Sequence, residues 1–147
     1  MTHTIVQRGG FEISTDHARL DLDLVCGFLR RSYWAEDIPR DTLEISIRNS
    51  LAFGVYDGKG AQVGFARVVS DRVRFAYLSD FFILENRRGK GLGKWLMEAI
   101  YANDELGDVE RWFLITRDAQ DFYRPLGFED APSGIVMLRS ALKESSD

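Results

Sequence analysis

The sequence predicts an α+β fold (α/β by some conventions), in which helices cover both faces of a mixed, mostly antiparallel sheet. Three observations support this prediction. Short runs that alternate apolar and polar residues indicate strands, apolar residues at helical spacing indicate helices, and a strand–helix–strand unit follows an antiparallel meander. The expected order of elements is β-α-α-β-β-β-α-β-α-β.

Length and composition are those of a globular protein. The 147 residues suit one domain with one core, and we expect a polar, frayed tail from about residue 140. Apolar residues make up 45% of the chain and charged residues 29%. The net charge of −4 argues against general nucleic-acid binding, which needs a basic surface.

Cysteine and histidine are too few for the usual metal sites. Cys26 is the only cysteine, so neither an internal disulfide nor a thiolate cluster can form, and its apolar neighbours predict a core residue. His3 and His17 both lie near the N-terminus, and we expect no metal. Because no signal-peptide or membrane-spanning run is apparent, we expect a cytoplasmic protein that does not bind membranes.

The first third of the chain predicts a strand and two helices. Residues 4–7 and 11–14 flank Gly9-Gly10, and the alternating run 11–14 is the expected first strand of the fold. Apolar residues at helical spacing predict a helix over about 21–32. Pro39 suits the start of a second helix over about 40–50.

The middle of the chain predicts a meander that leads into a helix. Strands are expected over 51–57 and 62–70, joined at Asp57-Gly58-Lys59-Gly60, which is typical of a hairpin turn. A long strand over about 73–84 follows, and a third helix is expected over about 91–103.

The last part of the chain predicts two strands around a short helix. Residues 109–116 form the first, and their continuous apolar run over 112–115 is typical of a strand buried on both faces. A short helix is expected over about 118–124, and the last strand over 134–139.

A glycine-rich turn joins the long strand to the third helix. Backbone N–H groups at such a turn, with the positive end of the helix, suit a phosphate. The P-loop pattern fails because Arg88 stands at its first glycine and Trp95 follows its Gly-Lys pair. The dinucleotide pattern fails because Lys94 or Leu96 takes the place of its third glycine.

The turn does meet the pattern Arg/Gln-x-x-Gly-x-Gly, over Arg88-Gly89-Lys90-Gly91-Leu92-Gly93. This stretch resembles the acyl-coenzyme A signature of the GNAT superfamily of N-acetyltransferases. A second segment, Ala119–Phe128, resembles the superfamily's Ala-x-x-Phe-Tyr-x-x-x-Gly-Phe segment. The resemblance covers about residues 50–130, and the first 50 only in the order of elements.

The resemblance implies an enzyme that transfers acetyl from acetyl-CoA to an amine by direct attack in a ternary complex, without a metal. Glycines let the backbone approach the pyrophosphate, and the pantetheine arm would pair with the strand's main chain like an extra strand. Thr116 stands where the superfamily often has Asn. The implied coenzyme-binding residues are Phe81, Phe82, Ile83, Arg88, Gly89, Lys90, Gly91, Leu92, Gly93, Lys94 and Thr116.

Tyr123 is the leading catalytic candidate. A phenol, with a reference pKa of about 10, is protonated at neutral pH and can donate a proton to the leaving thiolate. The alternative is that Tyr123 only packs on the last residues of the sheet. Spacing does not fix the base that takes the amine proton: Asp80 is the first choice, Glu36 and Asp37 are the next, and a chain of water molecules is equally open.

The acceptor side is less defined. The loop between the first two helices should wall it, which makes Tyr33, Trp34 and Glu36 the expected acceptor contacts. The acceptor could be a small molecule or a peptide amine, and dimers are common in the superfamily. Two other functions stay open: an inactive sensor of acyl-CoA, and a regulator whose N-terminal half binds a protein partner.

Overall fold

The computed structural model describes residues 3–141, so most of the predicted tail, residues 142–147, lies outside the described part. The chain forms two compact units, residues 1–115 and 116–147, and each is described by itself. The expectation of one domain stays a prediction. The strands are β1 (Ile5–Arg8), β2 (Phe11–Ser14), β3 (Leu51–Tyr56), β4 (Gln62–Ser70), β5 (Ala76–Ile83) and β6 (Trp112–Phe113). The longer helices are α1 (Leu22–Arg30), α2 (Arg40–Arg48), α3 (Leu92–Tyr101) and α4 (Gln120–Tyr123).

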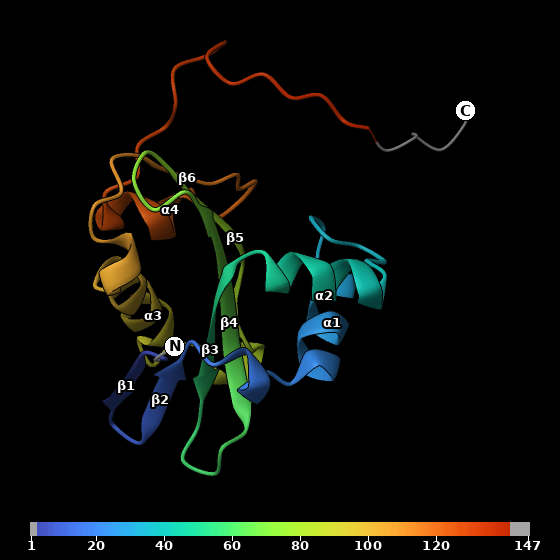
Figure 1. Ribbon diagram of the computed structural model, residues 1–147, viewed down its shortest axis with the longest axis vertical. Coiled ribbons are helices and arrows are strands. Elements are labelled where there is room, and N and C mark those ends of the chain that lie inside the picture. The colour runs from blue at the N-terminus through green and yellow to red at the C-terminus, as the bar shows by residue number, and fades with distance from the viewer. Residues whose placement is uncertain (1–2, 142–147) are drawn as a thin grey trace. The chain divides into compact units, whose positions relative to one another are not determined.

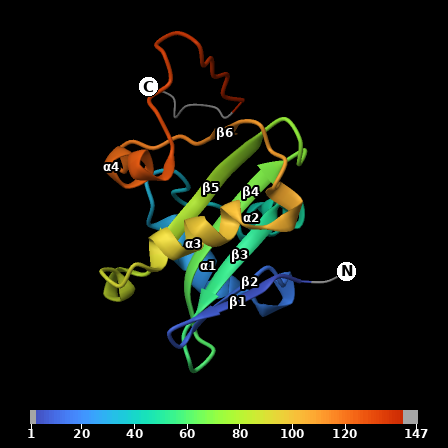
Figure 2. The ribbon, with the colours of Figure 1, turned by 90° about the vertical axis from the view of Figure 1, so that its left-hand side faces the viewer.

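The first unit is built on a six-stranded sheet in the order β1-β2-β3-β4-β5-β6. All neighbouring strands pair antiparallel except β5 and β6, which pair parallel. Helix α3 lies on one face of the sheet, and α1 and α2 lie on the other (Figure 1); Figure 2, turned by 90°, shows α3 crossing in front of the strands. The predicted fold class is therefore confirmed.

Local sequence signals explain how the helices begin and which side they bury. The Asp21 side chain accepts a hydrogen bond of 3.1 Å from the Leu24 N–H and so caps α1. Pro39 caps the start of α2, as predicted, because its fixed φ suits the residue that leads into a helix. Both helices turn an apolar stripe to the sheet, and the shared core holds Val25, Cys26, Leu29, Leu43, Ile47, Ala52, Phe65 and Phe82.

Three expectations from the sequence need correction. The run at residues 4–7 is a full strand, β1, paired with β2, so two strands precede α1. The strand expected over 109–116 covers only Trp112–Phe113, and Phe113 and Ile115 are exposed, so this run is not buried on both faces. Among the described residues it is the last strand of the sheet, so one of its edges is unpaired.

The last expected strand, over residues 134–139, is also not formed. No strand is assigned after β6 in the described residues, and Ile135, Val136, Met137 and Leu138 are exposed. The backbone hydrogen bond at this segment is local, from the Ile135 N–H to the Pro132 carbonyl. Apolar, β-branched residues favour a strand, but a strand also needs a partner ladder to satisfy its backbone.

Tyr56 gives a first testable prediction, on stability. Its side chain is buried, the Arg19 guanidinium lies 4.2 Å from its ring centre, and its hydroxyl has no hydrogen-bond partner among the described residues. Burial raises the pKa of Tyr56 to about 12. Burial keeps the phenol neutral in the folded protein, whereas the phenol of the unfolded chain ionises at pH ~10. The stabilisation that depends on the neutral phenol is therefore complete below pH ~10. It is lost as the pH rises toward 12, which lowers the free energy of unfolding by about 2 kcal/mol.

We therefore expect the free energy of unfolding of Tyr56→Phe at pH 7 to equal that of the wild type or to exceed it by up to about 1 kcal/mol. The reason is that the substitution removes a buried hydroxyl without a hydrogen-bond partner. The variant should also lose less stability between pH 10 and 12. Urea unfolding across this pH range measures both effects, with Tyr33→Phe, an exposed tyrosine, as the control. A loss of more than about 2 kcal/mol at pH 7 would mean that the Tyr56 hydroxyl has a partner.

Candidate active site

The glycine-rich turn takes a left-handed backbone at two positions. Gly89 has φ +84° and Gly91, the N-cap of α3, has φ +76°. Only glycine adopts such angles at little cost. A Cβ at either residue would meet no atom within 4 Å, so the space in front of both glycines is open. These two glycines are therefore required by the backbone rather than by crowding.

The start of α3 presents backbone N–H groups to this open space. The hydrogen bond from the Trp95 N–H to the Gly91 carbonyl, at 3.0 Å, closes the first turn of the helix. The N–H groups of Leu92, Gly93 and Lys94 precede it and point out of the helix end. The positive end of the helix dipole adds to them, so this turn can bind an anion such as a phosphate.

The charged side chains around the turn differ in what they already bind. Lys90 and Lys94 are exposed and form no ion pair with any residue that the structure describes. Arg88 donates through Nε to the Ile83 carbonyl at 3.1 Å. Arg87 pairs with Asp57 at 2.8 Å. The two lysines are thus the cations most open to an anionic ligand.

Strand β5 has an open edge beyond its second residue. Its parallel pairing with β6 consists of Ala76 with Trp112 and Tyr77 with Phe113, and it stops there. Among the described residues, no strand pairs with the later residues of β5 on that side. The expected pantetheine slot would lie there. The Leu84 N–H bonds to β4, so by alternation the main chain of Ile83 faces away from β4.

The same alternation changes what can be expected of Phe82. Its main chain faces β4, where it pairs with Phe65, and its ring is stacked on Phe28 at 3.9 Å between centroids. The Ile83 carbonyl already accepts from Arg88. The main-chain group of Ile83 that can meet a ligand in this slot is therefore its N–H.

Asp80 lies at an irregularity in β5. Phe65 pairs with Phe82 and Arg67 pairs with Ser79, so two residues of β5 stand opposite one residue of β4. This is a β-bulge, and Asp80 within it has φ +54°, an unusual angle for any residue other than glycine. Bulges and strained residues are frequent near active sites.

The Asp80 carboxylate is buried and is held by two side chains. Trp34 donates from its indole nitrogen to Oδ1 at 2.9 Å, and Arg67 donates from Nε to Oδ2 at 2.8 Å. Trp34 comes from the loop after α1, and its ring meets Tyr33 edge-on at 5.2 Å. The structure thus brings Trp34 and Asp80 together, whereas Glu36 is exposed on the loop. Their roles in catalysis stay predictions.

Arg67, Ser50 and Ser79 complete this cluster, and sequence reasoning missed all three. Arg67 donates to both serine hydroxyls, at 3.0 Å to Ser50 and 3.3 Å to Ser79. The available signal was Arg67 itself, a charged residue in the otherwise apolar run of β4. A charge in a buried strand needs a partner, and Asp80 was the acid on the neighbouring strand.

The second unit holds Tyr123 at the end of α4. The side chain is buried, and its ring meets Phe122 and Phe128 edge-on, at 4.9 and 5.6 Å between centroids. Thr116 accepts through its hydroxyl from the Ala119 N–H at 3.0 Å, next to the start of α4. The segment Ala119–Phe128 is therefore a small aromatic cluster that fixes the Tyr123 ring.

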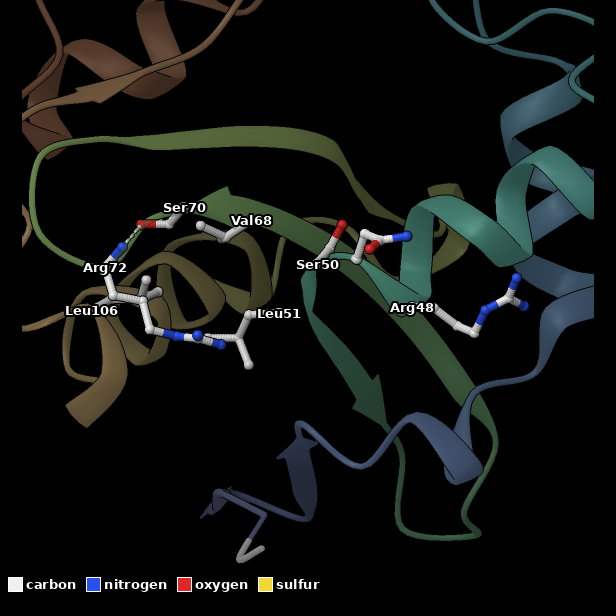
Figure 3. A pocket seen from close by; sticks show the side chains of 8 residues that line it. Arg48, Ser50, Leu51, Val68, Ser70, Arg72 and Leu106 are labelled. Carbon is white, nitrogen blue, oxygen red and sulfur yellow. Dashed lines mark hydrogen bonds between the residues drawn. The ribbon is translucent and has the colours of Figure 1, made fainter.

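A pocket of about 240 Å³ opens beside the start of β3 and the end of β4 (Figure 3). None of the site residues predicted from the sequence lines it. In Figure 3 the Arg72 side chain runs past Leu51, while Arg48 points away from it. Ser50 belongs both to this wall and to the Arg67 contacts. The lining residues are Arg48, Asn49, Ser50, Leu51, Val68, Ser70, Arg72 and Leu106.

The described residues hold neither a cluster of metal ligands nor a membrane-spanning helix. No three histidine, cysteine, aspartate or glutamate side chains gather as a metal site would require. No described helix has both the length and the apolar character needed to cross a bilayer.

The fold is a mixed sheet with helices on both faces, and it carries a candidate anion site at the start of α3. Comparison with known proteins gives the family. The profile of the acetyltransferase (GNAT) domain matches residues 48–130, more than half of the chain. The chain therefore belongs to the GNAT family of acetyltransferases, and the class of reaction is acetyl transfer.

Individual relatives agree with this assignment. A protein of Gibberella zeae named "Putative acetyltransferase FG08082" is 32% identical over 84% of this chain and 81% of its own length. A GNAT-family crystal structure from Xanthomonas campestris pv. campestris is 39% identical, has a TM-score of 0.84 and covers 91% of this chain and 95% of that chain. A structure from Deinococcus radiodurans R1, at 24% identity and a TM-score of 0.70 over 91% and 92% of the two chains, shows likeness of fold.

Proposed function

We propose that this protein transfers the acetyl group of acetyl-CoA to an amine by direct attack in a ternary complex. One observation carries the proposal: the start of α3, where Gly89 and Gly91 take positive φ and leave N–H groups open to an anion. Acetyl-CoA supplies a pyrophosphate for that turn, a pantetheine arm for the open edge of β5, and a reactive thioester.

The coenzyme contacts follow from the geometry of β5 and α3. The N–H groups of Leu92, Gly93 and Lys94 would bind the pyrophosphate, and Lys90 would add Coulombic attraction at the rim. The pantetheine arm would pair with the main chain of Ile83, which faces the open edge, and with that of Phe81, the contact expected from the sequence. Thr116 would be a further contact to the pantetheine arm, as the sequence motif predicts.

In the reaction, the acceptor nitrogen forms a bond to the acetyl carbon and the carbon–sulfur bond breaks. A main-chain N–H of β5 would stabilise the negative charge that develops on the carbonyl oxygen. Tyr123 would donate its phenolic proton to the leaving thiolate. The proton lost by the amine would pass to Asp80, directly or through water, and Glu36 or Asp37 would serve if Asp80 does not.

The acceptor would bind beside Trp34, whose indole is fixed on Asp80. Tyr33 and Trp34 offer exposed aromatic surface, and aromatic faces attract cationic amines as well as apolar groups. Glu36, on the same loop, would add negative charge near an incoming ammonium group. The particular amine is the open part of this proposal.

A thiol-release assay with acetyl-CoA over a panel of amines tests the proposal. The panel should include polyamines, amino acids, arylalkylamines and peptides with a free N-terminus or lysine, with a reaction lacking any amine as the control. We expect thiol release with at least one class, and mass spectrometry should show that acceptor gaining one acetyl group. Tight coenzyme A binding without thiol release from any amine would favour the alternative, an acyl-CoA sensor without transferase activity.

Two further expectations belong to this proposal. We expect a cytoplasmic location, which fractionation of cells that express the protein would test. We also expect a homodimer, as is common in the superfamily, and sedimentation of the purified protein would measure it.

A further inference from the structure

We propose that Arg67 is a positioning residue, which fixes the Asp80 carboxylate and, through it, the Trp34 ring on the acceptor side. No site role was expected of Arg67 from the sequence. The inference rests on the proposed function for its kinetic part, because it concerns the amine acceptor. The placement of Trp34 can be tested whether or not the acceptor is known.

Arg67 makes three side-chain contacts within the protein. Its Nε donates to Asp80 at 2.8 Å, one terminal nitrogen donates to Ser50 at 3.0 Å, and the other donates to Ser79 at 3.3 Å. The side chain is 15% exposed, and that of Asp80 is 7% exposed. A planar guanidinium with donors in a fixed fork can hold three acceptors at once, which an ammonium cannot do in the same geometry.

The bulge in β5 makes this arrangement possible. Neighbouring side chains of a regular strand point to opposite faces of the sheet, so Ser79 and Asp80 should not meet the same residue. Both contact Arg67, because the left-handed backbone at Asp80 brings its side chain to the face where Arg67 lies. The strained backbone at Asp80 is thus associated with the placement of one carboxylate.

The two oxygens of Asp80 have separate partners. Arg67 binds Oδ2, and Oδ1 accepts the hydrogen bond from Trp34. Trp34 is 43% exposed, so this hydrogen bond to a buried group helps to orient a ring that is partly open to solvent. Without Arg67 the carboxylate would be buried with an unbalanced charge, would turn or draw in water, and would no longer hold the indole in place.

The test compares Arg67→Met and Arg67→Lys with Arg74→Met, which removes an exposed arginine from the nearby β4–β5 turn. With the best amine from the panel, we expect Arg67→Met to lower kcat/KM for the acceptor about 10- to 100-fold, the effect of a small misplacement. KM for acetyl-CoA should stay within about 2-fold, because Arg67 is not among the proposed contacts to the coenzyme. Arg67→Lys should recover part of the loss.

Fluorescence supplies a readout that a merely structural role would not change. The emission of Trp34 is obtained by difference from Trp34→Phe, and acrylamide quenching reports its exposure. We expect quenching to rise in Arg67→Met and not in Arg74→Met. Unchanged Trp34 quenching in a folded Arg67→Met variant would overturn the proposal, as would equal losses for acceptor and acetyl-CoA.

A double-mutant cycle covers the case in which Arg67→Met does not fold. Arg67→Lys and Trp34→Phe keep most of the packing, and their effects on kcat/KM for the acceptor should be less than additive, since both act through Trp34. Full additivity would overturn the proposal. If the wild-type protein acetylates no amine, the proposed function fails, but Trp34 quenching in Arg67→Lys still decides whether Arg67 positions that ring.

Discussion

Replacing Tyr123 by Phe is expected to lower kcat about 100-fold, the lower end of what a general acid contributes. The phenol would protonate the thiolate as the carbon–sulfur bond breaks, and this interaction is made only in the transition state. Such a loss appears in kcat and kcat/KM equally, while KM for acetyl-CoA stays close to that of the wild type. Steady-state thiol release at saturating acceptor measures it.

The fold should tolerate this change. The Tyr123 ring packs edge-on against Phe122 and Phe128, and Phe keeps both contacts. Tyr101→Phe is the matched control, because it removes the same hydroxyl from a tyrosine of α3 whose ring meets Trp112 edge-on. The control should change kcat by less than about 2-fold, and the thermal midpoints of both variants should agree with the wild type to within a few degrees.

A kcat within about 3-fold of the wild type would contradict the assignment of Tyr123 as the general acid, since general acids contribute 100-fold or more. The coenzyme would then leave as a thiolate without help from this residue. A rise in KM for acetyl-CoA with unchanged kcat would instead mean that Tyr123 binds the coenzyme in its ground state.

Elements with a strong internal pattern could be predicted from the sequence. The apolar stripe of α1, the turn at Asp57–Gly60 and the break at the glycine turn each depend on neighbours within one element, and the structure has all three. The strand predicted over residues 134–139 was wrong for the opposite reason. Their apolar character favours a strand, but only a partner elsewhere in the chain can satisfy the backbone of a strand.

The candidate site divides in the same way. The glycine turn could be predicted because its chemistry lies in consecutive residues, and the structure gives Gly89 and Gly91 the positive φ that such a turn needs. The contact between Trp34 and Asp80 could be anticipated only as a meeting of a loop with a strand end. The contact between Arg67 and Asp80 could not be predicted, because it depends on a bulge for which the sequence of β5 gives no signal.

Replacing Gly91 by Val is expected to raise KM for acetyl-CoA about 10- to 100-fold, because hydrogen bonds to a charged phosphate contribute about 1.5–3 kcal/mol each. Valine is disfavoured at the φ of +76° that Gly91 adopts, so the first turn of α3 should shift. Its side chain would also project into the open space in front of the N–H groups of Leu92 and Gly93. Calorimetric titration with coenzyme A measures the affinity directly.

Gly60→Val is the matched control for backbone strain. Gly60 has φ +83°, and a Cβ there would also meet no atom within 4 Å, but the residue lies in the β3–β4 turn. Both variants should therefore lose similar stability, whereas only Gly91→Val should lose coenzyme affinity. At saturating acetyl-CoA, kcat of Gly91→Val should return to within about 3-fold of the wild type, because a phosphate contact far from the thioester contributes equally to ground and transition states. Equal losses of coenzyme affinity in both variants would mean that the loss comes from lower stability and not from the anion site at α3. Unchanged affinity in Gly91→Val would contradict the proposal that the pyrophosphate binds at this turn.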